Sequence, residues 1–165
     1  MSLGPVVVER ANLGDVDGIL KLAEANDAEN GGTLTGHLDR KRVAATIRRI
    51  PSVIARKDDQ VVGFLLTSEK TGSHMPFERK MLEIYPGEAD AYVYGPVCVD
   101  ASMRGHGLAE KMFAELRRLL PGREGILFIR ADNEPSLRAH RKMGMHPVAE
   151  FTCKGIKLIV FAYHG

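Results

Sequence analysis

The chain has 165 residues, 44% of them hydrophobic, so it can bury a sizeable core but is too short for two full domains. A formal net charge of +2, with no aromatic residues interleaved among the basic clusters, argues against nucleic-acid binding. The longest apolar run, 158–163, is far shorter than the ~20 residues that span a bilayer, and the first residues lack a signal-peptide pattern. We therefore expect one cytoplasmic domain over residues 1–165, with no membrane or nucleic-acid partner.

Hydrophobic periodicity predicts alternating strands and helices. Asn12 with Asp15 three residues later is typical of a helix N-terminus, and Asp58-Asp59 between two apolar runs is typical of a hairpin turn. The predicted elements, in chain order, are a strand over 6–9, a helix from Asn12 with the apolar stripe Val16, Ile19, Leu20 and Ala23, a helix from about His37 to Arg49, a hairpin of 53–56 with 61–66, a strand over 92–99, a helix after residue 107, a strand over 125–130, a helix from Asn133, and a last hairpin of Phe151 with 156–163. This order predicts a mixed α/β layer.

The two cysteines, Cys98 and Cys153, lie far apart in the sequence and lack metal-ligand spacing. We interpret both as buried free thiols in a reducing compartment, and we expect no metal site. Met1-Ser2-Leu3 is compatible with a cloning scar.

A glycine-containing turn, Arg104-Gly105-His106-Gly107-Leu108-Ala109, joins the strand-like run over 92–99 to a helical pattern. Its glycines let the backbone approach a ligand closely, and the helix start leaves N–H groups unpaired. These amides and the positive end of the helix dipole favour a pyrophosphate. A Rossmann site is excluded because Glu110 stands where the third glycine would be, and no Walker A sequence occurs.

Two motifs in this half of the chain carry a family resemblance. Arg104, Gly107 and Ala109 match the pattern Q/R-x-x-G-x-G/A, and the segment 133–145 is similar to N-x-x-[A/S]-x-x-x-Y-x-K-x-G-F. On these motifs the chain resembles the GNAT superfamily of acyl-CoA-dependent N-acyltransferases from about Tyr92 to the C-terminus. It departs from the pattern where His140 replaces the tyrosine and Met145 replaces the phenylalanine. The resemblance implies a single-domain α/β fold whose central mixed, mostly antiparallel sheet is flanked by helices.

The resemblance further implies acetyl-CoA as cosubstrate. The residues that it places at this cosubstrate are Val97, Cys98, Val99, Arg104, Gly105, His106, Gly107, Leu108, Ala109, Asn133, Ser136 and His140. Backbone N–H groups over 95–99 are candidate oxyanion donors, because the resemblance implies a bulge there, and Gly95-Pro96 inside a strand pattern supports that bulge. Asn133 is alternatively only a helix cap, and the basic residues over 138–142 are either adenosine-phosphate ligands or a solvated helix face.

Acyl transfer from a thioester to an amine needs a deprotonated amine, an oxyanion donor and an acid near the sulfur. In the resembled family a tyrosine at the position of His140 protonates the leaving thiolate, so His140 is the candidate acid, and Tyr94 or Tyr92 is the substitute. An imidazolium of pKa ~6.5 is a stronger acid than a thiol of ~8.5. The alternative for His140 is a packing role. Glu69 and Glu83 are candidate bases, and a water relay is equally open.

The long segment over 68–88 is predicted to be irregular, because glycines and prolines punctuate it and it exceeds the usual connection length. We expect it to wall the acceptor pocket together with the loop over 26–36; the alternative is a solvated loop without function.

The predicted function is N-acetyl transfer from acetyl-CoA to a primary amine by direct attack in a ternary complex. Two alternatives stay open: a CoA-binding regulatory or structural module without catalysis, and an unrelated phosphate-binding α/β domain. The acceptor is a small molecule or a peptide that the sequence does not identify, and the resemblance leaves a homodimer open.

Overall fold

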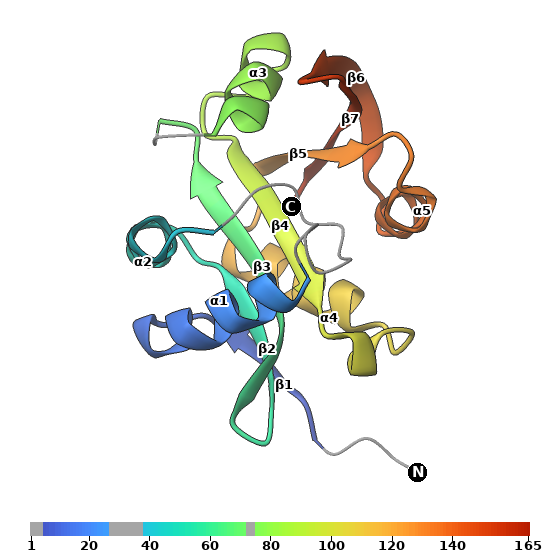
Figure 1. Ribbon diagram of the computed structural model, residues 1–165. Coiled ribbons are helices and arrows are strands. Elements are labelled where there is room, and N and C mark those ends of the chain that lie inside the picture. Colours follow the sequence, from blue (N-terminus) through green and yellow to red (C-terminus); the bar gives the residue numbers. More distant parts are fainter. Residues whose placement is uncertain (1–4, 27–37, 72–74) are drawn as a thin grey trace. The chain divides into compact units, whose positions relative to one another are not determined.

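The computed structural model describes residues 5–26, 38–71 and 75–165 (Figure 1). Its strands form a seven-stranded sheet in the order β1-β2-β3-β4-β5-β7-β6, in which β4 pairs with β5 in parallel and β1-β2-β3 and β5-β7-β6 are antiparallel. This confirms the predicted mixed, mostly antiparallel sheet flanked by helices. No helix in the described ranges is both long and apolar enough to cross a membrane.

The elements follow one another along the chain in the following order. They are β1 (Val7–Arg10), η1 (Leu13–Asp15), α1 (Val16–Ala25), α2 (Arg40–Arg49), β2 (Val53–Lys57), β3 (Gln60–Glu69), α3 (Pro76–Ile84), β4 (Tyr92–Val99), η3 (Ala101–Met103), α4 (Leu108–Leu119), β5 (Glu124–Arg130), α5 (Glu134–Lys142), β6 (His146–Cys153) and β7 (Ile156–His164). The chain divides into two compact units, Met1–Thr67 with Gly95–Leu120 and Ser68–Tyr94 with Pro121–Gly165. Residues of β4 therefore belong to both units.

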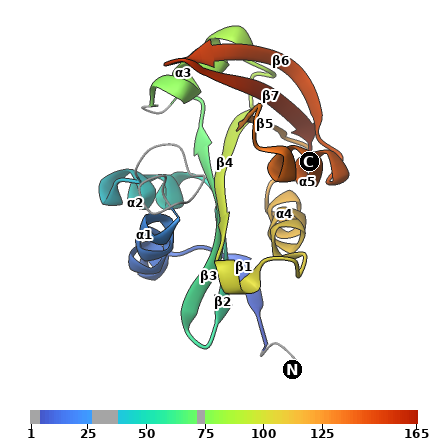
Figure 2. The same ribbon diagram turned by 45° about the vertical axis from the view of Figure 1, so that its right-hand side comes forward.

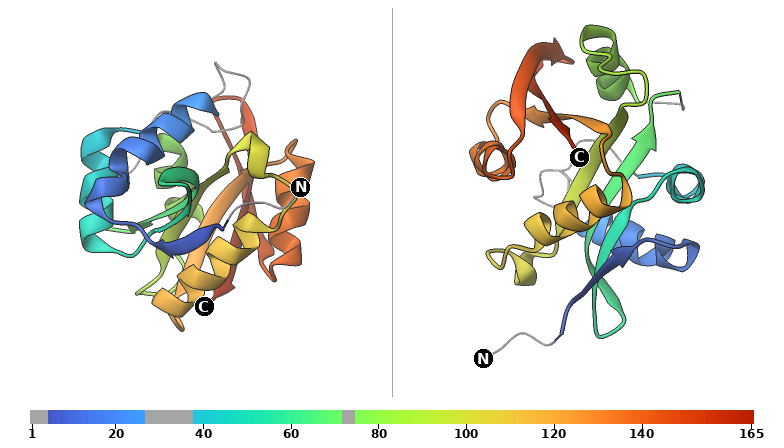
Figure 3. Two further views of the ribbon diagram at one scale, coloured as in Figure 1. Left: turned by 90° about the horizontal axis from the view of Figure 1, so that it is seen from below. Right: turned by 180° about the vertical axis from the view of Figure 1, so that it is seen from behind.

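In the first unit, α1 and α2 cover one face of the β1-β2-β3 ribbon and α4 covers the other (Figure 3). Strand alternation decides which side chain goes where. Ile54 and Phe64 pack in one apolar cluster with α1 and α2, whereas Gly63 lies on the opposite face against Met112 of α4. The apolar stripe predicted for α1 is buried at Val16, Ile19 and Ala23, whereas Leu20 is only half-buried and Leu22, which was not predicted, is buried.

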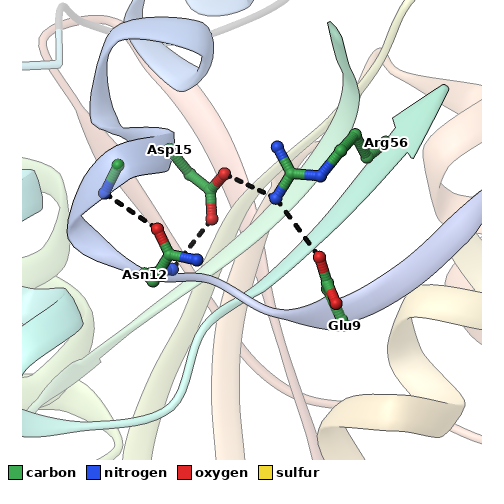
Figure 4. Close-up of polar contacts among 5 residues, drawn as sticks. Glu9, Asn12, Asp15 and Arg56 are labelled. Carbon is green, nitrogen blue, oxygen red and sulfur yellow. Dashed lines mark hydrogen bonds and ion pairs between the residues drawn. The ribbon is translucent and has the colours of Figure 1, made fainter. Parts of the chain in front are cut away.

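An ion pair with a buried carboxylate joins the start of the first helical segment to β2 (Figure 4). The Asn12 side chain accepts a hydrogen bond from the Gly14 N–H at 2.8 Å, and the Asn12 N–H donates to Asp15 Oδ2 at 2.9 Å, which confirms the predicted cap. The Arg56 guanidinium donates to Asp15 Oδ1 at 2.7 Å and to Glu9 Oε1 at 3.2 Å. Asp15 is only 3% exposed, so Arg56 is what makes burial of its carboxylate tolerable. The hydrogen bond to Asp15 is the largest cause that raises the pKa of Arg56.

The hairpin predicted between β2 and β3 is present. Asp58 and Asp59, which connect the two strands, have φ angles of +50° and +64°. Aspartate tolerates this left-handed region better than most residues, which is why the pair marks the turn in the sequence. The second predicted helix begins at Arg40 with Asp39 as its cap, and the predicted start at His37 lies outside the described residues.

In the second unit, α3 and α5 lie on opposite faces of the β5-β7-β6 strands (Figure 2). Val93, Ile126 and Val160 share an apolar cluster with Met81 of α3. The residues that alternate with them along the strands face α5 instead, and Arg141 of α5 lies over the Phe161 ring at 5.9 Å. The opposite-face set matters for the site, because it contains Tyr92, Tyr94 and Tyr163.

The segment over 68–88 contains the end of a strand and a helix, contrary to the prediction of irregular chain throughout. β3 continues to Glu69, and α3 covers Pro76–Ile84, with Met81 fully buried. Pro76 misled the sequence interpretation: in the first turn of a helix proline loses nothing, because the N–H that it lacks would be unpaired there. The expected role in walling an acceptor pocket stays a prediction, and residues 72–74 and 27–36 lie outside the described residues.

Both cysteines are free, as predicted. Cys98 is buried in the core of the first unit, but Cys153 is only half-buried, so the prediction of two buried thiols is wrong for Cys153. Cys153 is the last residue of β6, which among the described residues is an edge strand paired with β7. The end of this strand is therefore partly open to solvent.

Candidate active site

The glycine turn leads into α4 in the first unit with a backbone that requires glycine. Gly107 is the N-cap of α4 with φ +72°, and Gly105 has φ +82°. A Cβ at either position would have no atom within 4 Å, so packing does not demand glycine there, whereas backbone conformation does. The Lys111 N–H donates to the Gly107 carbonyl at 3.1 Å, which closes the first turn of α4 onto its N-cap glycine. Open space beside left-handed glycines at a helix N-terminus suits an anion.

The side chains flanking these glycines anchor the turn or point outward. Leu108 is buried and Ala109 is half-buried, whereas His106 is exposed. Leu108 therefore holds the first turn of α4 against the core of the unit, and anion binding by the backbone of the turn stays a prediction.

Arg104 braces this turn against two other elements of the first unit. Its Nε donates to the Val99 carbonyl at 3.3 Å, and its Nη2 donates to Asn26 Oδ1 at 2.7 Å. The Asn26 amide in turn donates to the Leu22 carbonyl at 2.9 Å, near the C-terminus of α1. The sequence interpretation missed this role of Asn26, which it assigned to the loop over 26–36. No local signal could have found it, because 78 positions separate the two partners.

The first-unit part of β4, residues 95–99, is irregular where the sequence predicted a bulge. Gly95 has φ +113°, and the Gly95-Pro96 peptide is cis. The Cys98 side chain lies in the core cluster with α1 and α2. Burial raises the pKa of its thiol to about 11, against a smaller opposing effect of Arg104. Cys98 is thus a neutral packing residue, and only its backbone is available to a ligand. The roles of Val97 and Val99 at a cosubstrate stay predictions.

In the second unit, two of the predicted catalytic residues lie in contact. Tyr94 Oη is 3.2 Å from His140 Nε2, and the two rings meet edge to face with centroids 5.6 Å apart. His140 Nδ1 lies 2.8 Å from the Ser136 carbonyl oxygen and 3.3 Å from its hydroxyl. A carbonyl oxygen can only accept, so Nδ1 carries the proton and Nε2 is left as an acceptor for the tyrosine hydroxyl.

Burial keeps both members of this pair neutral. Tyr94 and His140 are each 4% exposed. Burial raises the pKa of Tyr94, with a smaller contribution from Tyr92, so its hydroxyl keeps its proton. Burial also lowers the pKa of His140, against a smaller opposing effect of the Ser136 backbone. Imidazolium is therefore scarcer here than in an exposed histidine, which weakens the prediction that resting His140 is the acid.

Tyr163 joins this pair to Tyr92, and the sequence interpretation gave it no role. Its ring meets the rings of Tyr92 and Tyr94 edge to face, with centroid separations of 6.3 and 5.8 Å, and its hydroxyl is hydrogen-bonded to that of Tyr92. The Arg123 guanidinium lies over the Tyr92 ring at 5.4 Å. The period of two along β7 could have placed Tyr163 on the face of Phe161, but no motif marked it.

The two candidate bases lie in different surroundings. Glu69 pairs with Arg123 at 3.1 Å. Glu83 is exposed on α3, which packs on the face of the strands opposite to Tyr94. Both assignments stay predictions.

Asn133 caps α5, as one of its two predicted roles requires. Its side chain accepts a hydrogen bond from the Ser136 N–H at 3.3 Å. This cap fixes the first turn of α5, which contains Ser136, and the Ser136 carbonyl accepts from His140. Asn133 therefore supports the Tyr94–His140 pair indirectly. Contact of Asn133 with a cosubstrate stays a prediction.

Comparisons with known proteins give one family match and several structures of similar fold. The family model described as acetyltransferase (GNAT) family matches residues 22–145. No curated protein matches the chain. Similar solved structures include an N-acetyltransferase from Staphylococcus aureus Mu50 (20% identity, 98% of this chain and 99% of that one, TM-score 0.71). Others are yncA, a putative acetyltransferase from Salmonella typhimurium with its cofactor acetyl-CoA (15%, 98% and 94%, 0.68), and Arabidopsis thaliana NAA60 in complex with acetyl-CoA (14%, 97% and 99%, 0.70). At these identities the structures show a shared fold.

Proposed function

Because the chain belongs to the GNAT acetyltransferase family, we propose that residues 1–165 form one domain that transfers the acetyl group of acetyl-CoA to a primary amine. The amine attacks the thioester directly in a ternary complex, and no acyl-enzyme forms. Two structures of similar fold, from Salmonella typhimurium and Arabidopsis thaliana, were solved with acetyl-CoA, which supports the choice of cosubstrate.

The observation that carries the proposal is the left-handed glycine turn at the start of α4. Gly105 and Gly107 leave open space on the side where a Cβ would lie, so backbone amides can approach the pyrophosphate of CoA. Arg104 holds the turn through Asn26 and Val99 and adds positive charge beside it. We assign Val97, Cys98, Val99, Asn133 and Ser136 to the pantetheine arm through their backbone or polar groups.

The chemistry needs little from the protein beyond placement and proton transfer. Holding the amine against the thioester supplies much of the rate. Backbone N–H groups over 95–99 are our proposed oxyanion donors, and the Tyr94–His140 pair is the proposed source of the proton for the leaving thiolate. Glu69 is retained as the proposed base, with its carboxylate held by Arg123.

Thermal unfolding with and without CoA tests the binding part of the proposal. CoA at about a hundred times its dissociation constant should stabilise the fold by about 2.7 kcal/mol, whereas NAD and ATP at the same concentration should do little. Equal stabilisation by ATP would favour an unrelated phosphate-binding domain.

Release of free thiol from acetyl-CoA tests the catalytic part. The assay uses a panel of primary amines comprising peptide N-termini, lysine, spermidine and an aminoglycoside, with acetyl-CoA alone as the background. We expect release above that background with at least one class. Tight CoA binding without release from any of them would favour a CoA-binding module that has lost catalysis.

A further inference from the structure

The two nitrogens of the His140 ring are both engaged. Nδ1 donates to the Ser136 carbonyl at 2.8 Å, and Nε2 faces the Tyr94 hydroxyl at 3.2 Å. An imidazole has no third nitrogen, so in this arrangement the ring cannot also protonate a sulfur atom. Any proton that passes between His140 and a substrate must cross the Tyr94 hydroxyl.

We propose that Tyr94 and His140 form a proton relay in which the Tyr94 hydroxyl meets the reacting atoms and neutral His140 acts behind it as the proton store. Tyr94 is then the catalytic residue, and His140 is a positioning and proton-accepting residue that contacts no substrate. The inference rests on the proposed acetyl transfer and adds a specific path for its protons.

The relay balances the protons of the transfer itself, so the proposed base, Glu69, is needed only to deprotonate the ammonium form of the amine before attack. As the amine nitrogen bonds to the thioester carbon, it loses a proton to Tyr94 Oη while the tyrosine proton passes to His140 Nε2. The tetrahedral intermediate then expels the CoA thiolate and restores the carbonyl. Finally, the Nε2 proton returns to Tyr94 Oη, and the tyrosine proton goes to the sulfur. The products are the acetylated amine and the CoA thiol, and the pair ends as it began.

The surroundings of the ring suit a proton store that is neutral at rest. Its hydrogen-bond partners among the described residues are Tyr94 of β4 and Ser136 of α5, both uncharged. From β7, Tyr163 packs against Tyr94. Arg141, the next residue on α5, lies over the Phe161 ring. Burial lowers the pKa of His140, so the proton that it accepts is readily returned.

A double-mutant cycle with thiol release as the readout tests the relay. Tyr94→Phe and His140→Phe should each lower kcat by about 10²-fold, and the double variant should be no slower than the slower single one, because either change breaks the same path. The KM for acetyl-CoA should change little. Tyr85→Phe and His146→Phe are the matched controls, since Tyr85 bonds Glu124 and His146 is exposed on β6. Losses that multiply in the double variant would overturn the relay.

The direction of the pH dependence separates the relay from direct donation by an imidazolium. A relay needs neutral His140, so the ratio of kcat/KM between the wild type and His140→Tyr should fall toward acid pH, below the ordinary histidine pKa of ~6.5. Taking the ratio with one amine cancels the ionisation of that amine. A ratio that falls toward alkaline pH instead would mean that imidazolium is the acid and would overturn the proposal.

NMR of the histidine ring nitrogens gives a readout that does not depend on turnover. Long-range proton–nitrogen spectra at pH 7.5 should show His140 protonated on Nδ1, with the Nε2 signal shifted in Tyr94→Phe. Protonation on Nε2 would overturn the relay whatever the activity. If the wild type binds CoA but releases no thiol with any amine of the panel, the proposed function fails and the relay with it. If release persists while the losses multiply, the relay alone fails.

Discussion

Tyr163 lies directly against the backbone of Gly125, its cross-strand partner in the β5–β7 pair. A Cβ built on Gly125 would come within 2.4 Å of two ring carbons of Tyr163 and 2.5 Å of its hydroxyl oxygen. The bare Cα therefore lets the ring lie flat across β5 and reach Tyr92 and Tyr94. Glycine at this strand position is explained by close approach of a side chain.

We expect Gly125→Ala to displace the Tyr163 ring and to destabilise the protein by ~1–3 kcal/mol, as overpacking of a buried site usually does. Because Tyr163 packs on Tyr94, kcat should fall more than the KM for acetyl-CoA rises. Urea unfolding and thiol-release kinetics measure the two effects. Tyr163→Phe keeps the ring and serves as the control for loss of the hydroxyl alone. Wild-type stability in Gly125→Ala would show that the ring is free to move aside.

Gly107→Val should raise the KM for acetyl-CoA strongly, because the side chain would occupy the open side of the turn and valine is strained at φ +72°. Gly122→Val is the matched control. Gly122 has φ +76° and the same open space at its Cβ, but it lies in the connection between α4 and β5 and belongs to the other unit. Both variants should lose similar stability, and only Gly107→Val should lose CoA affinity by calorimetry. Equal CoA affinities in the two variants would contradict the assignment of the turn to pyrophosphate.

His140 should make the protein less stable in acid. Its pKa is lowered in the fold, so the unfolded chain binds a proton more readily. This contribution to stability is fully present above the unfolded pKa of ~6.5 and is lost as the pH falls through the lower folded value. The Glu88 partner raises the pKa of His164, so its contribution has the opposite sign and is lost as the pH rises. Urea unfolding of the wild type and His140→Gln from pH 5 to 8 isolates His140. A stability difference between the two that does not change with pH would contradict the prediction.

Asp15→Ala should destabilise the protein far more than Glu9→Ala, although both carboxylates accept from Arg56. The Asp15 side chain is 2% exposed and that of Glu9 is 47% exposed. Because Arg56 is only partly buried, loss of Asp15 should cost less than the ~3–5 kcal/mol typical of fully buried pairs, whereas an exposed pair contributes ~0–1 kcal/mol. Since Asp15 also caps the first helical segment through the Asn12 N–H, its removal adds to that cost. Chemical denaturation of both variants checks the ranking, and similar losses would contradict it.

Features set by neighbours in the sequence could be predicted from it. The Asn12–Asp15 cap, the Asp58-Asp59 turn and the glycine turn before α4 each depend on interactions within a few residues. Their residue types favour particular backbone conformations, so these conformations can be predicted without tertiary information. The two motifs that suggested the family lie on such local features, which is why the family and the cosubstrate could be predicted from the sequence.

The helix α3 was local and was still missed. Proline is found both after the end of a helix and in its first turn, and the sequence alone does not distinguish the two positions. Here the packing of Met81 against the sheet shows that Pro76 begins a helix. Tertiary packing resolved the ambiguity that local propensity left.

Apart from α3, the sequence by itself determined the order of strands and helices, together with the conformation of the glycine turn and the pair of motifs, because short-range sterics and hydrogen bonds fix them. Only the tertiary structure decided that Tyr94 faces His140 across 46 positions and that Arg104 holds Asn26 across 78. Such pairs depend on strand register and on which face of a helix is buried, and a shift of one residue along a strand would turn Tyr94 to the opposite face.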